Sequence, residues 1–355
     1  MPTNVGIIGC GNISAIYLKN LPTHGHLKLV AVADLDMSRA QAKAAEHNLR
    51  ALTVEQMLAD PGIDLIVNLT IPKAHAEVNM RAIAAGKHAY CEKPLAVTVE
   101  DGRKTLEAAK AKGVRVGCAP DTVLGGGIQT CRKLIDEGVI GTPIGATAFM
   151  TTPGHELWHP DPEFYYKAGG GPMFDMGPYY LSALVQLLGP VARVTGSTRI
   201  THPTRTIRSQ PKAGQTITVD VPTTYAGVMD FANGAVGMIL QTFDVWGANL
   251  PRIEVYGSEG TLSVPDPNTF GGPIKLLRSS TRTWEEVPLA FGFIENSRGL
   301  GVADMAQAIQ NGTVHRASGD VAYHVLEVMA AFERASNSGQ HIKIESTVAS
   351  PPIME

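Results

Sequence analysis

Residues 5–14, VGIIGCGNIS, decide the fold of the N-terminal half. The run begins as a short apolar stretch without polar alternation, which is typical of a strand buried on both faces of a parallel sheet. Two glycines then open a predicted helix: Gly9 permits the tight turn, and Gly11 lets a pyrophosphate approach the backbone N–H groups. The turn therefore predicts a dinucleotide site at Gly9, Gly11, Asn12 and Ile13, with Ser14 at the third position, where glycine or alanine is usual.

An acidic residue ends the second predicted strand, Leu27–Asp34. A carboxylate at this place accepts hydrogen bonds from the ribose hydroxyls of the adenosine half of a dinucleotide. It also repels a 2′-phosphate, and the next two residues, Leu35 and Asp36, supply no cation. Arg39 is the nearest cation, and it fits a solvated helix face. These residues predict NAD as the cofactor in preference to NADP.

The strand pattern changes partway along the chain. Through the first 120 residues, strands alternate with helices of about 10–15 residues, which predicts a doubly wound parallel sheet. Beyond position 143 the expected strands are rich in β-branched and aromatic residues: Gly145–Thr152, Thr223–Phe231, Ala235–Thr242, Arg252–Tyr256 and Ile274–Leu277. Asn233 and Gly234 join two of them and favour a type I′ hairpin.

Two domains are expected from this change of pattern. Residues 1–121 should form a Rossmann domain in the α/β class. Residues 122–355 should form an α+β domain with a large, open, mainly antiparallel sheet that carries helices on one face.

Length and charge exclude several classes of protein. The chain has 355 residues, enough for two domains, and its 30 Lys and Arg against 33 Asp and Glu leave no basic excess for a nucleic acid. No apolar run is long enough to span a membrane, and the N-terminus lacks the features of a signal peptide. The four cysteines are too widely spaced for a zinc knuckle or a redox pair. We expect a cytoplasmic protein that acts on a small molecule and binds neither nucleic acid nor membrane.

Residues 155–159, HELWH, match the spacing of a zinc-protease helix. That motif needs positions i and i+4 on one face of an α-helix. Pro160 follows His159 directly, and the residue before a proline is disfavoured in helical geometry. We therefore expect no metal site here.

An ordered set of motifs resembles the Gfo/Idh/MocA family of oxidoreductases. The set comprises the glycine turn, the acid after the second strand, Glu92-Lys93-Pro94 after the fourth strand, and a glycine-rich segment with Asp175 and Gly177. The resemblance covers nearly the whole chain. It implies NAD(P)-dependent oxidation of a sugar, cyclitol or related polyol, and a homodimer or homotetramer assembled through the second-domain sheet.

The resemblance also implies residues around the cofactor. Glu92 and Lys93 are expected to border the nicotinamide, and a cis peptide bond is expected before Pro94. Thr70, Pro72 and His75 are expected near the cofactor ribose.

The chain departs from the family pattern at the acid–base position. Tyr179 stands where the family has a histidine, and Ser182 stands where it has a second aspartate. The catalytic residues implied by resemblance are then Lys93, Asp175 and Tyr179. The proton is taken either by Tyr179, helped by the Lys93 ammonium, or by Lys93 itself with its ammonium destabilised by burial.

The loop before the glycine-rich segment supplies further candidates. His155 and His159 are reserves for the acid–base role. The rings of Trp158 and Tyr166 could stack on the apolar face of a sugar, and His159 and Lys167 could bind its hydroxyls.

Two other functions stay open at this point. One is an NAD-dependent lyase or glycosidase that uses hydride transfer only transiently. The other is a non-catalytic regulator that senses a dinucleotide or a sugar. Because a sensor has no need of both Lys93 and Asp175, their joint presence favours a dehydrogenase.

Overall fold

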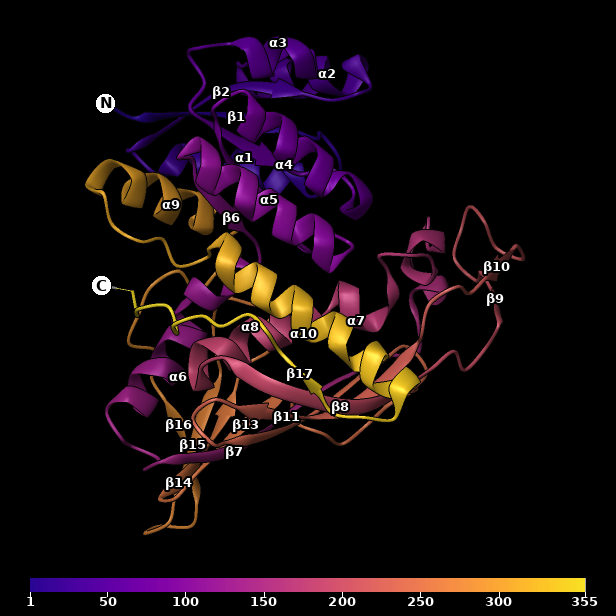
Figure 1. Cartoon of the computed structure of the whole chain (residues 1–355), viewed down its shortest axis with the longest axis vertical. Coiled ribbons are helices and arrows are strands. Elements are labelled where there is room, and N and C mark those ends of the chain that lie inside the picture. The colour runs from indigo at the N-terminus through magenta and orange to yellow at the C-terminus, as the bar shows by residue number, and fades with distance from the viewer. Residues whose placement is uncertain (355) are drawn as a thin grey trace. The chain divides into compact units, whose positions relative to one another are not determined.

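The computed structural model describes residues 1–354 and divides into two compact units (Figure 1). The first unit comprises Met1–Leu124 and Glu295–Leu326. The second comprises Gly125–Ile294 and the chain from Glu327 onward. The division expected after residue 121 placed all later residues in the second domain, whereas residues 295–326 belong to the first unit.

Helix α9 (Leu300–Asn311) accounts for much of that return. The buried carboxylate of Asp121 accepts the backbone N–H groups of Gly299 and Gly301 at 2.8 and 3.0 Å. The ring of His26, which precedes β2, lies 3.0 Å from the carbonyl oxygen of Ala303. These contacts join α9 to the parallel sheet of the first unit.

The first unit is built on a six-stranded sheet in the order β3-β2-β1-β4-β5-β6. All five pairings are parallel, which confirms the predicted doubly wound sheet. Its strands are β1 (Thr3–Ile8), β2 (Leu27–Ala33), β3 (Arg50–Leu52), β4 (Leu65–Asn68), β5 (His88–Cys91) and β6 (Val116–Cys118). Strand order reverses between β1 and β4, and sheets of this kind bind ligands outside the carboxyl ends of the strands at that point.

Helices connect these strands. They are α1 (Ser14–Asn20), α2 (Met37–His47), α3 (Val54–Ala59), α4 (His75–Ala84) and α5 (Val99–Lys112), with α9 and the start of α10 (Gly319–Ser338) added from the later chain. Across residues 1–354, no helix has the length and apolar character to cross a membrane.

The second unit contains a nine-stranded sheet in the order β16-β15-β14-β13-β7-β12-β11-β8-β17. Its strands are β7 (Pro143–Thr151), β8 (Val191–Arg199), β11 (Thr224–Phe231), β12 (Val236–Thr242), β13 (Ile253–Gly257), β14 (Gly260–Val264), β15 (Ile274–Arg278), β16 (Trp284–Val287) and β17 (Ile342–Lys343). The pair β7 and β12 is parallel and the other pairs are antiparallel, so the sheet is mainly antiparallel as predicted.

The remaining elements of this unit are short or helical. They are α6 (Gly126–Asp136), α7 (Gly171–Asp175), α8 (Gly177–Leu188), the two-stranded ribbon of β9 (Thr204–Thr206) and β10 (Thr216–Thr218), and the last part of α10. Helices lie along one face of the large sheet, where Figure 1 shows α8 and the end of α10. Phe332 of α10 packs over Gly196 and Gly227, where an added Cβ would come within 3.1 and 2.5 Å of its ring.

The other face of the sheet is open at β12. Val236 and Met238 are 49% and 54% exposed, whereas Gly237 and Ile239, which alternate with them, are buried. This alternation is what a strand with one covered and one uncovered face requires.

The hairpin between β11 and β12 corrects the predicted type I′ turn. That turn needs a positive φ at both central residues, but only Gly234 has one, at 91°. Gly234 N–H donates to Phe231 O at 3.0 Å, and Phe231 N–H donates to Ala235 O at 2.9 Å. The loop is therefore a three-residue connection with a left-handed glycine. The side chain of Asn233 stabilises it by accepting the Ala235 N–H at 3.0 Å.

Candidate functional site

The glycine turn after β1 has the geometry that a dinucleotide needs. Gly9 has a φ of 108°, and a Cβ there would lie 2.6 Å from the Leu69 carbonyl group, so only glycine fits. A Cβ on Gly11 would meet no atom within 4 Å, which leaves open space in front of the backbone. Ser14 is accommodated because its hydroxyl donates to the Gly11 carbonyl oxygen at 2.6 Å.

Asp34 fixes this turn from the end of β2. One carboxylate oxygen accepts the Cys10 N–H at 2.7 Å, and the other accepts the Asp36 N–H at 2.9 Å. Each oxygen keeps capacity for a further hydrogen bond. Burial and the neighbouring Asp34 carboxylate together raise the pKa of the Cys10 thiol to about 11, so this thiol stays neutral.

The residues next to Asp34 suit an adenosine ribose that carries no 2′-phosphate. Arg39 lies 3.5 Å from Asp36 as an exposed ion pair, so this cation has a carboxylate partner. Leu35 is 97% exposed, and Ile71 after β4 is 68% exposed. Sequence reasoning missed these two apolar side chains. Their signal was their position, two residues after β2 and three residues after β4, at the carboxyl edge of the sheet.

His75 is buried, and both of its ring nitrogens lie against backbone carbonyl groups. The ring is 1% exposed, with Nδ1 2.7 Å from the Pro94 carbonyl oxygen and Nε2 3.0 Å from that of Thr70. Burial lowers its pKa. Thr70 is held in turn by Asn68, whose side-chain oxygen accepts its hydroxyl at 2.6 Å. The ring of His75 thus positions Thr70 and Pro94, and its place near the cofactor ribose stays a prediction.

The segment after β5 contains the expected cis peptide bond between Lys93 and Pro94. Glu92 is 9% exposed, and both of its oxygens are engaged. The Tyr17 hydroxyl donates to Oε1 at 2.7 Å, and the Lys93 N–H donates to Oε2 at 3.1 Å. Burial raises the pKa of Tyr17 well above its usual value. The place of Glu92 and Lys93 beside a nicotinamide stays a prediction.

The second unit pairs Asp175 with an imidazole. Oδ2 of Asp175, the last residue of α7, lies 3.4 Å from Nε2 of His155. The imidazole is stacked on Tyr165 with ring centroids 3.9 Å apart, and the ring centroids of Phe243 and Trp158 lie 4.5 and 5.3 Å from its own. Nδ1 of His155 is buried and has no partner among residues 1–354.

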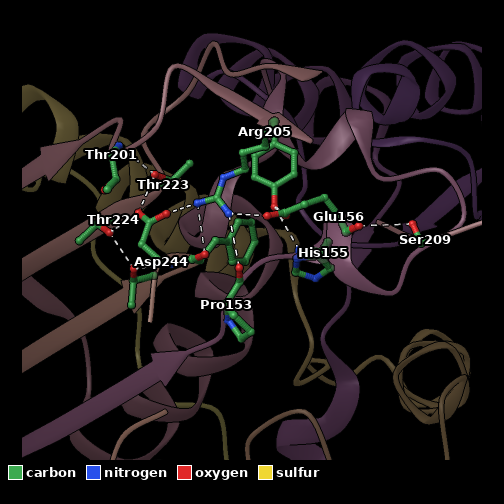
Figure 2. A network of polar contacts seen from close by, with 12 residues as sticks. Pro153, His155, Glu156, Thr201, Arg205, Ser209, Thr223, Thr224 and Asp244 are labelled. Carbon is green, nitrogen blue, oxygen red and sulfur yellow. Dashed lines mark hydrogen bonds and ion pairs between the residues drawn. The ribbon is translucent and has the colours of Figure 1, made fainter. Parts of the chain in front are cut away.

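A buried ion cluster anchors the loop that carries this histidine (Figure 2). Arg205 of β9 donates to Glu156 Oε1 at 2.7 Å and also pairs with Asp244. Tyr166 donates to the other oxygen of Glu156 and accepts the His155 N–H at 3.1 Å. The residues come from four separate stretches of sequence, so no spacing could have revealed the cluster.

Tyr166 is therefore corrected as a predicted substrate contact. Its side chain has no exposed surface, and the Arg205 guanidinium lies 5.1 Å from its ring centroid. Burial, followed by the Glu156 hydrogen bond, raises the pKa of its hydroxyl.

The other candidates from this loop are partly or largely exposed to solvent. Trp158 is 62% exposed, and Lys167 binds Asp220 at 2.9 Å. His159 Nδ1 accepts the Asp161 N–H at 3.0 Å.

Tyr179, the candidate at the family's histidine position, lies in the first turn of α8 and is buried.

The HELWH segment is not an α-helix. It forms a short 3-10 turn, η4 (His155–Leu157), and His159 lies outside it, as predicted from Pro160. Within the described part of the chain, no three His, Cys, Asp or Glu side chains gather as metal ligands would.

Two family models match the chain. Residues 3–119 match the oxidoreductase family with an NAD-binding Rossmann fold, and residues 128–263 match the GFO/IDH/MocA C-terminal domain.

Individual relatives are oxidoreductases of sugars and inositols. The 1,5-anhydro-D-fructose reductase of Ensifer adhaerens is 29% identical over 269 residues, covering 72% of this chain and 74% of that protein. Inositol 2-dehydrogenase 3 of Saccharopolyspora erythraea is 28% identical over 305 residues, covering 81% and 80%. The structure of levoglucosan dehydrogenase in complex with NADH matches at a TM-score of 0.84 and 22% identity, over 98% of this chain and 100% of that one, which establishes likeness of fold.

Proposed function

Because the chain belongs to the Gfo/Idh/MocA family of oxidoreductases, we propose that it transfers a hydride between the nicotinamide of NAD and a hydroxyl-bearing carbon of a sugar, cyclitol or related polyol. The observation that carries this proposal is the His155–Asp175 pair, with 3.4 Å between its nitrogen and oxygen. An imidazole beside a carboxylate is equipped to move a proton, which a protein that only senses its ligand does not need.

The cofactor proposed is NAD in preference to NADP. The glycine turn supports dinucleotide binding because it combines open space at Gly11 with a carboxylate at Asp34. Asp34 would accept the ribose hydroxyls and repel a 2′-phosphate. The residues proposed to hold the cofactor are Gly9, Gly11, Asn12, Ile13, Asp34, Thr70, Pro72, Glu92 and Lys93. When bound, NAD supplies the hydride acceptor, and the chain supplies orientation and proton transfer.

Proton transfer is proposed to depend on Lys93 and Asp175. The family resemblance supports both, and the contact of Asp175 with an imidazole adds support for a role in moving a proton. Trp158, His159 and Lys167 are proposed as contacts for substrate hydroxyls or for the apolar face of a ring. Tyr179 is the candidate at the family's histidine position.

A panel of sugars and cyclitols tests this function. Purified protein with NAD is mixed with each compound, and NADH is followed by its absorbance. We expect steady accumulation of NADH with at least one compound and its loss in Asp175→Asn. Product formed without NADH accumulation would point instead to transient hydride transfer. Tight NAD binding without any product would point to a sensor.

We also propose a cytoplasmic location and assembly through the open face of the nine-stranded sheet. The four cysteines are all buried and free, which suits a reducing compartment. The exposed apolar side chains of β12 support the assembly.

A further inference from the structure

We propose that His155 is the residue that takes the hydroxyl proton, and that Asp175 holds it in the tautomer this requires. The inference rests on the proposed function and names its acid–base residue. It moves that role away from the family's position, which Tyr179 occupies here, to the loop after β7.

The contact between the two side chains selects the tautomer of the imidazole. His155 begins η4, and Asp175 ends α7, so two separate elements of the second unit bring them together. A carboxylate 3.4 Å from Nε2 favours the form with its hydrogen on that nitrogen. The lone pair is then on Nδ1, and only a nitrogen with a lone pair can accept a proton.

Nδ1 is also the polar atom of this pair that lacks a partner. It is buried and forms no hydrogen bond within residues 1–354. Buried polar atoms are normally paired, so an unpaired one indicates a place for a ligand atom. A substrate hydroxyl would satisfy Nδ1 as a hydrogen-bond donor.

The surroundings of the imidazole suit a polyol. Tyr165 and Trp158 place aromatic surface beside it, and rings of this kind stack on the C–H faces of sugars. Trp158 is 62% exposed and its ring centroid lies 5.3 Å from that of the imidazole. A ligand that stacks on the Trp158 ring would therefore lie next to His155.

The backbone of His155 is fixed by the ion cluster of Figure 2. The His155 N–H donates to Tyr166, and the neighbouring Glu156 binds both Tyr166 and Arg205. The side chains of Arg205 and Glu156 are only 6% and 8% exposed, so solvent does little to screen the attraction between their charges. A pre-positioned base loses little orientation freedom when substrate binds. In this scheme Arg205 and Tyr166 are positioning residues.

The proposed step balances in protons and electrons. The substrate O–H bond breaks and its proton goes to Nδ1, while the C–H bond breaks and its electron pair leaves as hydride to NAD. The carbon is oxidised to a carbonyl, and NAD is reduced to NADH. The Asp175 carboxylate stabilises the imidazolium that forms.

Steady-state kinetics on the best compound of the panel provide the first test. We expect His155→Gln to lower kcat/KM by about 10²–10⁴-fold with little change in the KM for NAD. His202→Gln, which alters an exposed histidine of the same unit, should leave kcat/KM unchanged. Free imidazole should restore part of the activity of His155→Ala, a rescue that a purely structural histidine would not allow.

Two kinetic results would overturn the inference. One is a His155→Gln enzyme that retains more than about a third of wild-type activity. The other is loss of activity in Tyr179→Phe together with no imidazole rescue of His155→Ala.

Nitrogen NMR of histidine-labelled protein provides a second test that does not need turnover. The His155 resonances, assigned by their absence in His155→Gln, should show hydrogen on Nε2, and Asp175→Asn should change that preference. A His155 signal unaffected by Asp175→Asn would overturn the inference even if no compound of the panel is oxidised. Absence of turnover in the wild type would by itself contradict the proposed function.

Discussion

Lys93 and Asp175 are the side chains whose removal should cost most activity. We expect Lys93→Met and Asp175→Asn each to lower kcat/KM by about 10²–10⁴-fold, the usual size of an acid–base contribution. Both changes nearly conserve side-chain volume, so thermal unfolding should shift little. Lys112→Met, an exposed lysine at the end of α5, is the matched control. Near-wild-type kcat/KM in both variants would remove these residues from the reaction.

Asp34 should decide which coenzyme is used. The wild type should favour NAD, and Asp34→Ser should raise the ratio of kcat/KM for NADP to that for NAD by about tenfold or more, because the repulsion of a 2′-phosphate is lost. Asp36→Asn keeps a capping side chain for α2 and should leave the ratio unchanged. A wild-type enzyme that prefers NADP tenfold would contradict the assignment.

Whether the surroundings of a residue could be predicted from the sequence depends on how far along the chain its contact partners lie. Gly9 and Asp34 belong to one local strand–turn–helix unit, and the structure gives them the expected geometry. Tyr166 was expected to contact a substrate, but it is buried against Glu156, a partner that no local pattern reveals. His75 was expected near the cofactor ribose, and its contact with the Pro94 carbonyl oxygen could not be predicted. His155 was only a reserve candidate, because its contact with Asp175 depends on how the second unit folds.

At the scale of elements, the burial of Asp121 beside the start of α9 makes stability depend on pH, although the hydrogen bonds from Gly301 and Gly299 partly oppose the effect. Burial raises the pKa of the Asp121 carboxyl to about 6. A raised folded-state pKa means that the folded chain binds more protons than the unfolded chain between about pH 4 and pH 6. The resulting stability, up to about 3 kcal/mol, is present below that window and is lost as the pH rises through 6.

Asp121→Asn tests this dependence, since an amide oxygen can still accept the Gly299 and Gly301 N–H groups. Chemical unfolding at several pH values should show the stability of Asp121→Asn relative to wild type increasing from pH 4.5 to pH 7.5. A difference that stays constant over that range would show that Asp121 does not titrate there.

Long elements with a periodic pattern were predicted more readily than short ones or than pairings between distant strands. β3 is a three-residue edge strand without alternation, and it was missed together with α3. α3 had a usable signal in Thr53 and Gln56, which form a capping box. The parallel pairing of β7 with β12 joins strands far apart in the chain, and strand composition alone cannot indicate direction.

At the scale of the whole chain, the return of residues 295–326 to the first unit could not be predicted. α9 carries a helical pattern that would suit either unit. Its assignment depends on Asp121 and His26, whose partners lie at Gly299, Gly301 and Ala303. Contacts between segments this distant leave no periodic trace in the sequence.

The open face of the nine-stranded sheet should determine the oligomeric state. Val236 and Met238 expose apolar surface on β12, and a face of this kind is stabilised when a second copy covers it. We expect light scattering at micromolar concentration to show a dimer or tetramer. Met238→Glu would bury an unpaired charge in that interface and weaken assembly by about a hundredfold or more. Val314→Glu changes an apolar residue that is 75% exposed outside this sheet and should leave the assembly intact. A wild-type monomer, or a Met238→Glu variant that assembles as the wild type does, would show that this face is not the interface.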